Sequence, residues 1–338
     1  MGTYQIALAD LDDDGDMDAV FSNMHARTLI LFNDGFGNYL ESDQIFSQGY
    51  AGVEARDIDR DHDLDLLFGP SHEVYTRSPL YLNNGTGVFE EGQLDVRGTG
   101  IFTIGAHLVD VDGDGDLDAL FQKARETILY INDGKSNFSL SSATYPDMSV
   151  FCDLNDDGFV DIFAREVGQG FRVYLNNGDG EFSKFCFFEN RILLRCSTVF
   201  ADVDNDGDPD AIYTNGEGKL YPSGILLNDG TGRFVESNQE LPSVDMSWVC
   251  TNDLNGDGWV DLVFTDWGRP CQVWINDGAG KFEDSGIRFA GKGRIACCEI
   301  ADIDNDGDND VFIGNYTDGT NTIWFNQTYV SQAIDGKR

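Results

Sequence analysis

Residues 10–18 read Asp10-Leu11-Asp12-Asp13-Asp14-Gly15-Asp16-Met17-Asp18, a run of six aspartates around one glycine. Close variants of this nine-residue loop begin at six later positions, which are Asp57, Asp110, Asp153, Asp202, Asp253 and Asp302. The intervals between neighbouring starts range from 43 to 53 residues and average about 49. Seven such intervals account for nearly all 338 residues, so the sequence predicts a single domain over residues 1–338 made of seven repeats.

The loop pattern places side-chain oxygens where one cation can contact them all. Carboxylates at positions 1, 3, 5 and 9 converge if the chain turns sharply at position 6, where Gly15 accepts a positive φ without a Cβ clash. Position 7 adds a backbone carbonyl. An all-oxygen cage of this kind suits Ca²⁺ better than Mg²⁺ or Zn²⁺, so the sequence predicts up to seven Ca²⁺ ions.

The predicted ligands occupy positions 1, 3, 5, 7 and 9 of each loop, with position 7 acting through its backbone carbonyl. They are Asp10, Asp12, Asp14, Asp16 and Asp18; Asp57, Asp59, Asp61, Asp63 and Asp65; Asp110, Asp112, Asp114, Asp116 and Asp118; Asp153, Asn155, Asp157, Phe159 and Asp161; Asp202, Asp204, Asp206, Asp208 and Asp210; Asp253, Asn255, Asp257, Trp259 and Asp261; and Asp302, Asp304, Asp306, Asp308 and Asp310.

Three positions depart from this pattern. His62 replaces the glycine at position 6 of the second loop, and a histidine accepts a positive φ only at some cost. Asn155 and Asn255 each remove one carboxylate, from the fourth and sixth loops. We expect these last two sites to bind the cation more weakly.

A second motif follows each of the first six loops and reads Asn33-Asp34-Gly35-Phe36-Gly37-Asn38-Tyr39 in the first repeat. Asn-Asp-Gly is a hairpin-turn signal, and the closing aromatic residue returns to the core. Each repeat therefore holds four short strands: A enters the metal loop, B leaves it, C runs into the hairpin turn, and D follows it. Seven such repeats predict an all-β, seven-bladed β-propeller of four-stranded antiparallel blades, with a linear solenoid as the alternative.

The seventh repeat lacks the second half of the hairpin motif after Asn326. Either Tyr329–Ile334 supplies its outer strand or that strand is absent. The sequence therefore leaves open how the last blade closes the ring.

The composition is strongly acidic, with a formal net charge of −38. Of the 60 acidic residues, 33 lie in the seven loops, so the charge mostly reflects the predicted metal sites. An acidic chain does not bind nucleic acid by the usual basic footprint.

No apolar run reaches 18 residues, so membrane insertion is not expected. The chain opens almost directly on the first predicted strand, without a signal peptide.

Seven cysteines at irregular spacing give no disulfide framework. Four of them precede metal loops, where we expect buried free thiols: Cys152, Cys250, Cys297 and Cys298. Cys186 with Cys196 is the one bridge that the sequence suggests.

The repeats resemble FG-GAP/VCBS repeats, which build the seven-bladed propeller of integrin α-subunit heads and of several surface proteins. The resemblance covers essentially the whole chain and rests on Asp-x-Asp/Asn-x-Asp-Gly-x-x-Asp followed by Asn-Asp/Asn-Gly-x-Gly-x-Phe. It implies Ca²⁺ loops between strands A and B on one rim of the propeller. It says little about activity, because one fold carries many functions.

The opposite face, formed by the B–C and D–A connections, is the candidate ligand-binding surface. Aromatic residues beside Arg and His suit carbohydrate stacking or a protein contact. The candidates are His25, Arg27, His72, Tyr75, Arg77, Trp267, Arg269 and Tyr316. The plain alternative is that exposed loops simply collect polar residues and tyrosine.

Taken together, these features favour a calcium-stabilised extracellular or cell-surface binding module that recognises a glycan or a protein. Loops of this type bind Ca²⁺ at about 10⁻⁴–10⁻³ M, a concentration found outside cells. One alternative is a polysaccharide lyase or hydrolase using His25, Arg27, His72, Tyr75 and Arg77, and another is a structural ectodomain of a larger surface protein. We favour binding over catalysis and assign no catalytic residue.

Overall fold

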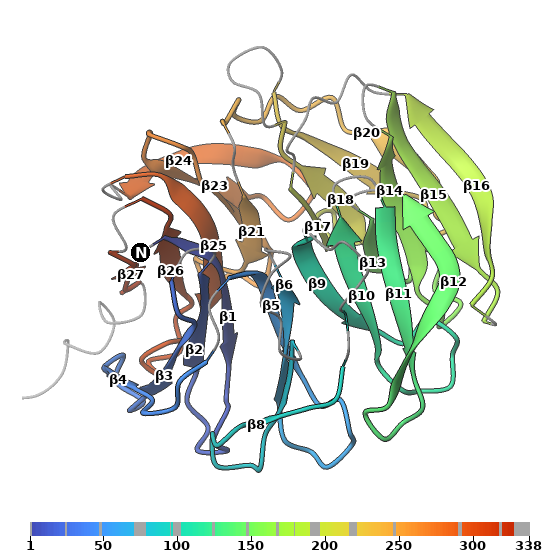
Figure 1. Cartoon of the computed structure of the whole chain (residues 1–338). Coiled ribbons are helices and arrows are strands. Elements are labelled where there is room, and N and C mark those ends of the chain that lie inside the picture. Colours follow the sequence, from blue (N-terminus) through green and yellow to red (C-terminus); the bar gives the residue numbers. More distant parts are fainter. Residues whose placement is uncertain are drawn as a thin grey trace, which may run out of the picture.

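The computed structural model describes residues 2–23, 26–46, 49–70, 79–94, 96, 103–123, 126–146, 149–166, 169–178, 180–189, 197–215, 222–245, 248–289, 293–317 and 320–327. These residues form seven separate antiparallel sheets that follow one another around a ring (Figure 1). The described part of the chain contains no helix, and hence none long and apolar enough to cross a membrane. The predicted seven-bladed β-propeller is therefore confirmed.

Each sheet runs outward from the centre of the ring in sequence order. The innermost strands are β1 (Thr3–Ala9), β5 (Tyr50–Arg56), β9 (Thr103–Val109), β13 (Val150–Cys152), β17 (Thr198–Ala201), β21 (Val249–Asn252) and β25 (Ile295–Ala301). The second strands are β2 (Asp18–Asn23), β6 (Asp65–Pro70), β10 (Asp118–Lys123), β14 (Asp161–Glu166), β18 (Asp210–Tyr213), β22 (Asp261–Phe264) and β26 (Asp310–Asn315).

The third and fourth strands complete the blades toward the outside. The third strands are β3 (Leu29–Asn33), β7 (Leu80–Leu82), β11 (Glu126–Asn132), β15 (Gly170–Asn176), β19 (Gly224–Asn228), β23 (Cys271–Asn276) and β27 (Thr322–Trp324). The outer strands are β4 (Tyr39–Glu41), β8 (Glu90–Glu91), β12 (Phe138–Pro146), β16 (Phe182–Glu189), β20 (Phe234–Glu236) and β24 (Phe282–Phe289). The seventh sheet has three strands in the described residues, and Tyr329–Ile334 lies outside them.

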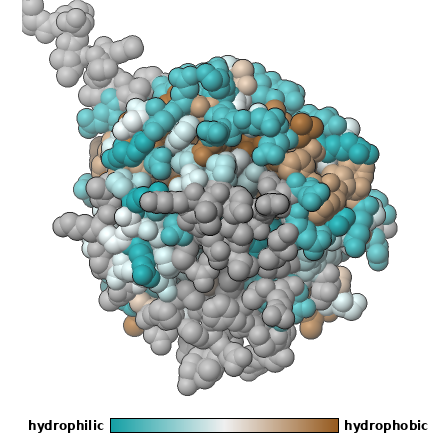
Figure 2. Space-filling model, turned by 90° about the horizontal axis from the view of Figure 1, so that it is seen from above, coloured by the Kyte–Doolittle hydropathy of each residue, from teal (hydrophilic) through white to brown (hydrophobic). Residues whose placement is uncertain are grey.

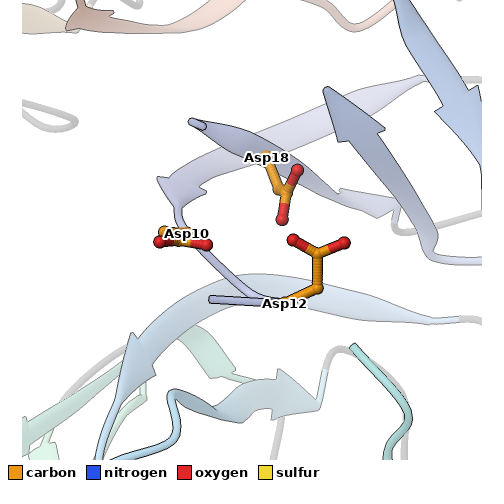
Figure 3. A group of neighbouring side chains, drawn as sticks. All are labelled: Asp10, Asp12 and Asp18. Atoms are coloured by element: carbon orange, nitrogen blue, oxygen red, sulfur yellow. The ribbon is translucent and has the colours of Figure 1, made fainter. Parts of the chain in front are cut away.

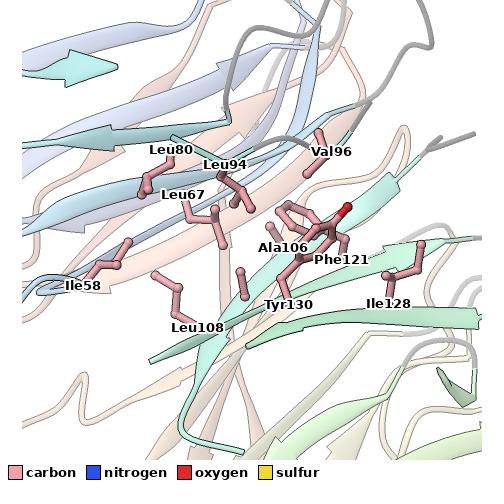
Figure 4. Packing of buried hydrophobic residues seen from close by; sticks show 11 residues of the cluster. Ile58, Leu67, Leu80, Leu94, Val96, Ala106, Leu108, Phe121, Ile128 and Tyr130 are labelled. Atoms are coloured by element: carbon pink, nitrogen blue, oxygen red, sulfur yellow. The ribbon is translucent and has the colours of Figure 1, made fainter. Parts of the chain in front are cut away.

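The hydrophobic core is divided among the interfaces between blades. Seven clusters of buried residues occur, and each one joins two neighbouring blades. Between the second and third blades, for example, Leu67 and Leu80 pack with Phe121 and Tyr130 (Figure 4). Burying apolar surface on both faces of each sheet stabilises the ring as a whole, because no blade can cover its own faces alone.

The ring closes by packing between the first and last blades. Strand β1 lies beside β25, and Ile6, Ala19 and Phe21 of the first blade share a cluster with Cys297 and Phe312 of the seventh. A linear solenoid would leave these faces exposed, so that alternative is wrong. Among the residues that the structure describes, the two blades meet face to face and share no strand.

A disulfide links Cys250 of β21 to Cys298 of β25, whose Cα atoms lie 6.3 Å apart. The expectation that both are free thiols is therefore wrong. The two cysteines lie one repeat apart on neighbouring inner strands, so the bridge ties the sixth blade to the seventh. Cys152, Cys186, Cys271 and Cys297 are free, and Cys196 lies outside the described residues.

Candidate metal loops and the opposite face

Each acidic loop connects the innermost strand of a blade to the second strand, as predicted. In the first blade, Asp10 accepts a hydrogen bond on Oδ2 from the backbone N–H of Gly15 at 2.9 Å. Asp14 accepts on Oδ1 from the backbone N–H of Asp16 at 3.0 Å. Both bonds recur in all seven loops, at 2.7–3.1 Å and 2.9–3.1 Å. The same two hydrogen bonds therefore define the shape of the loop in every blade.

The aspartate at position 9 anchors the loop to the sheet. Asp18 accepts from the backbone N–H of Leu11 on Oδ2 at 2.9 Å and from that of Asn33 on Oδ1 at 2.8 Å. All seven equivalents make the same two bonds and are fully buried. Burial raises the pKa of Asp18 to about 7, although the two hydrogen bonds oppose this shift.

Carboxylates converge within these loops. The side chains of Asp10, Asp12 and Asp18 point toward a common space, with potential ligand oxygens within 4.8 Å of one another (Figure 3). Comparable groups form in four other loops, from Asp57, Asp59 and Asp61; Asp110, Asp112 and Asp118; Asp202, Asp204 and Asp206; and Asp302, Asp304 and Asp306.

The aspartate at position 3 has an unsatisfied oxygen in those same five loops. This oxygen, Oδ1, is buried and has no hydrogen-bond partner in Asp12, Asp59, Asp112, Asp204 and Asp304. Burial, together with the neighbouring carboxylates, raises the pKa of all five residues. Buried acceptors without donors are costly, and an all-oxygen donor set is the kind that a hard divalent cation satisfies. The residues present therefore fit Ca²⁺.

The fourth and sixth loops form a second class. Asn155 and Asn255 stand at position 3 and donate from Nδ2 to Asp157 and Asp257, each at 2.9 Å. These loops also carry an aromatic residue at position 7, Phe159 or Trp259, where the other five carry aspartate. They therefore offer fewer carboxylates to a cation.

The second loop keeps its shape despite the missing glycine. His62 has a φ of 80°, so it adopts the left-handed conformation that position 6 requires. Its backbone N–H still donates to Asp57 at 3.1 Å. In the same loop, Arg60 forms an ion pair with Asp116 of the third loop, with 2.6 Å between Nη2 and Oδ1. Neighbouring loops are thus in direct contact on the rim.

A further contact between blades involves the first asparagine of each hairpin motif. The Nδ2 group of this asparagine donates to the backbone carbonyl at position 2 of the preceding blade's loop. The pairs are Asn83 to Leu11, Asn132 to Ile58, Asn176 to Val111, Asn228 to Leu154, Asn276 to Val203, Asn326 to Leu254 and Asn33 to Ile303, at 2.6–3.3 Å. The sequence predicted these asparagines only as turn residues. Their presence in all seven repeats could have indicated this second role, because the seventh repeat keeps the asparagine although the rest of its hairpin motif is missing.

The B–C and D–A connections lie on the opposite face, because strands in each sheet alternate in direction. Two of the predicted ligand-face residues, Trp267 and Tyr316, come together there, and Arg269 lies on the same connection as Trp267. Trp267 stacks on Tyr316 with ring centroids 5.8 Å apart, and Arg269 forms an ion pair with Asp266 at 2.7 Å. Arg294, which was not among the predicted residues, lies over the Trp267 ring at 4.6 Å.

Of the other predicted ligand-face residues, the structure describes only Arg27. Arg27 forms an ion pair with Glu41 of β4 in its own blade. His25, His72, Tyr75 and Arg77 lie outside the described residues. Seen from above, the described surface is largely hydrophilic with smaller hydrophobic areas (Figure 2).

The inner strands also carry a polar pair that sequence reasoning missed. His107 of β9 and Glu54 of β5 lie 3.0 Å apart between Nδ1 and Oε1. Burial alone would lower the pKa of His107, but hydrogen bonds to Glu54 and Gln122 and the charge of Glu54 together raise it. No repeated motif marks this pair, because the equivalent position in other blades is mostly apolar.

The fold and the loops define a β-propeller with acidic loops on one rim. Residues 153–213 and 253–313 match the FG-GAP-like repeat. The chain thus carries FG-GAP-like repeats in a seven-bladed, integrin-α-like propeller, and the resemblance drawn from the motifs is confirmed.

Among curated proteins, the chain is similar to cartilage acidic protein 1 of Mus musculus, with 22% identity over 92% of this chain and 48% of that protein. It also matches a T-cell immunomodulatory protein homolog of Plasmodium falciparum, with 30% identity over 34% of this chain and 18% of that protein. The chain thus spans about half the length, or less, of the curated relatives it matches.

Among solved structures, an Agrocybe aegerita lectin that recognises non-reducing terminal N-acetylglucosamine has a TM-score of 0.59 and 20% identity. That match covers 84% of this chain and 79% of the lectin. BBS1N, solved in complex with ARL6DN, has a TM-score of 0.61 and 10% identity over 97% of this chain and 93% of its own. At these identities the likeness concerns the fold alone.

Proposed function

We propose that this chain is a calcium-stabilised extracellular module that binds a glycan or a protein through the face opposite the acidic loops. The observation that carries the proposal is the separation of two kinds of site. The loop rim holds carboxylates with unsatisfied buried oxygens, whereas an aromatic and arginine group that includes Trp267 and Tyr316 lies on the other face.

The loops suit a structural role for the ion. Their ligands sit at the junction of strands A and B, and Asp18 and its equivalents also hold the hairpin asparagine of the same blade. A bound cation would offset the repulsion among these carboxylates and so stabilise both the loop and the interface behind it. Excess EDTA should lower the melting temperature sharply, and restoring Ca²⁺ should reverse the loss. An unchanged melting curve in EDTA would show that the ion has no structural role.

The opposite face supports a binding role. Likeness to a glycan-specific lectin and to a domain solved with a protein partner is compatible with either kind of ligand. A glycan array probed with the Ca²⁺-loaded chain tests the glycan branch. Substitution of Trp267 or Tyr316 by alanine should abolish any array signal while the metal-loaded melting temperature stays high. An array signal that persists in both variants would show that the glycan binds at another surface of the protein.

The lyase or hydrolase alternative has no specific observation in its favour. Among its proposed residues only Arg27 is described, and its guanidinium is paired with Glu41. The ectodomain alternative is compatible with relatives about twice as long as this chain, and it does not conflict with a binding role for the propeller.

A further inference from the structure

Trp267, Arg294 and Tyr316 form one rigid group on the face opposite the acidic loops, although they come from three separate connections. Trp267 and Arg294 form an isolated β-bridge. The backbone N–H of Tyr316 donates to the carbonyl of Arg294 at 2.8 Å, and the backbone N–H of Arg294 donates to Thr317 Oγ1 at 2.9 Å. These backbone contacts hold the three segments together without a ligand, which reduces the entropy that they lose on binding.

The two arginines of this region differ in their charge balance. Arg269 is neutralised by Asp266, a fully buried carboxylate at 2.7 Å, and also donates to the Ser243 carbonyl. Arg294 is exposed and has no ion-pair partner among the residues that the structure describes. Its guanidinium rests on the indole ring of Trp267. Arg294 is therefore the available positive charge of the group.

The position of Arg294 determines which ligand chemistry it can meet. Its Cζ lies 4.6 Å from the centre of the Trp267 ring, and the guanidinium N–H groups can bind a carboxylate with two parallel hydrogen bonds. Tyr316 stacks on the same Trp267 ring and is partly exposed, and an aromatic ring of this kind suits the C–H face of a sugar.

We propose that this group binds the acidic sugar residue of a glycan, with the sugar carboxylate at Arg294 and the sugar ring against Tyr316. The inference rests on the proposed function, since it specifies the ligand of the same face. A glycan end with one carboxylate fits better than an acidic peptide, because the chain carries a net charge of −38 and repels ligands with many negative charges.

Methyl β-glucuronide and methyl β-glucoside form a matched probe pair, since they differ only in the carboxylate. Binding to the Ca²⁺-loaded chain is followed by saturation-transfer NMR, and an array of neutral and carboxylated glycans extends the test to longer ligands. We expect the carboxylated member of each pair to bind at least about tenfold more tightly. Arg294→Gln should remove that preference, and Arg294→Lys should restore it only in part. Arg288→Gln, which changes an exposed arginine paired with Asp284 on an outer strand, should leave it intact.

The outcomes separate this inference from the proposed function. Equal binding of neutral and carboxylated glycans, unaffected by Arg294→Gln, overturns the inference and leaves a glycan-binding face in place. Binding of an acidic peptide that Arg294→Gln abolishes, without glycan binding, also overturns it but retains the face. Absence of binding to any glycan on the array overturns the inference together with the glycan branch of the proposed function.

Discussion

Asn33 of the first blade donates from Nδ2 to the backbone carbonyl of Ile303 in the seventh blade, at 2.8 Å. The two residues are 270 positions apart, and the bond is the last of a set of seven that runs around the ring. The backbone N–H of Asn33 also donates to Asp18, the last residue of the acidic loop of its own blade. Each such asparagine therefore connects the loop of one blade to the loop of the preceding blade.

Replacing Asn33 by alanine should destabilise the closed ring. The substitution leaves the buried carbonyl of Ile303 without this donor, and we expect a loss of about 1–3 kcal/mol in the free energy of unfolding. Asn38→Ala is a matched control, because Asn38 lies in the same hairpin but is exposed and bonds only Asp34. Urea denaturation of both variants in Ca²⁺ measures the difference. Equal stability of the two variants would contradict the role of the inter-blade bond.

The two classes of loop predict two classes of Ca²⁺ site. Five loops carry aspartate at position 3, whereas Asn155 and Asn255 reduce the negative charge of the other two, and affinity for Ca²⁺ depends on ligand charge. Calorimetric titration should therefore resolve five tighter and two weaker sites. Asp204→Asn should move one site from the tighter to the weaker class, while Asp277→Asn, in a hairpin outside the loops, should leave the ratio unchanged. Seven equivalent sites in the unmodified chain would refute this prediction.

Local patterns were sufficient to predict the blades and the loops. The residues from Asp10 to Asp18 fold back on themselves through bonds within nine positions, so their spacing alone indicates the structure. Contacts that depend on how blades meet could not be predicted in this way. Arg294 reaches Trp267 only because a D–A connection passes beside the B–C connection of the preceding blade. Likewise, Cys250 lies three residues before its loop and Cys298 four residues before its own, so their side chains leave opposite faces of equivalent inner strands and meet only where two blades pack together.

Lowering the pH of the solution should stabilise the folded protein when no cation is bound. Burial raises the pKa of Asp65 and Asp118 to about 7 and that of Asp161 and Asp210 to about 6, compared with about 3.9 for an unfolded chain. At a pH between the unfolded and the folded pKa, these aspartates are protonated in the folded state and ionised in the unfolded state. The resulting stability is fully present below the unfolded pKa and is lost as pH rises through 6 to 7.

In EDTA, the melting temperature should therefore rise when the pH falls from about 7.5 to about 5.5. With saturating Ca²⁺ the trend should weaken or reverse, because the cation binds the ionised carboxylates and competes with protons. Thermal unfolding at both pH values, with and without Ca²⁺, provides the comparison. The same pH trend in both conditions would mean that protonation of the buried aspartates and binding of the cation are not coupled.

The Glu54–His107 pair predicts a histidine with a raised pKa between the second and third blades. Burial lowers the pKa of His107, but its hydrogen bonds to Glu54 and Gln122 and the charge of Glu54 outweigh this effect, so protonation of His107 is favoured in the folded state. This contribution to stability is present below the unfolded pKa of histidine, about 6.5, and is lost as pH rises through the higher folded pKa. Glu54→Gln should lower the pKa of His107 measured by NMR titration. A His107 pKa that does not move in this variant would show that Glu54 does not set the charge of His107.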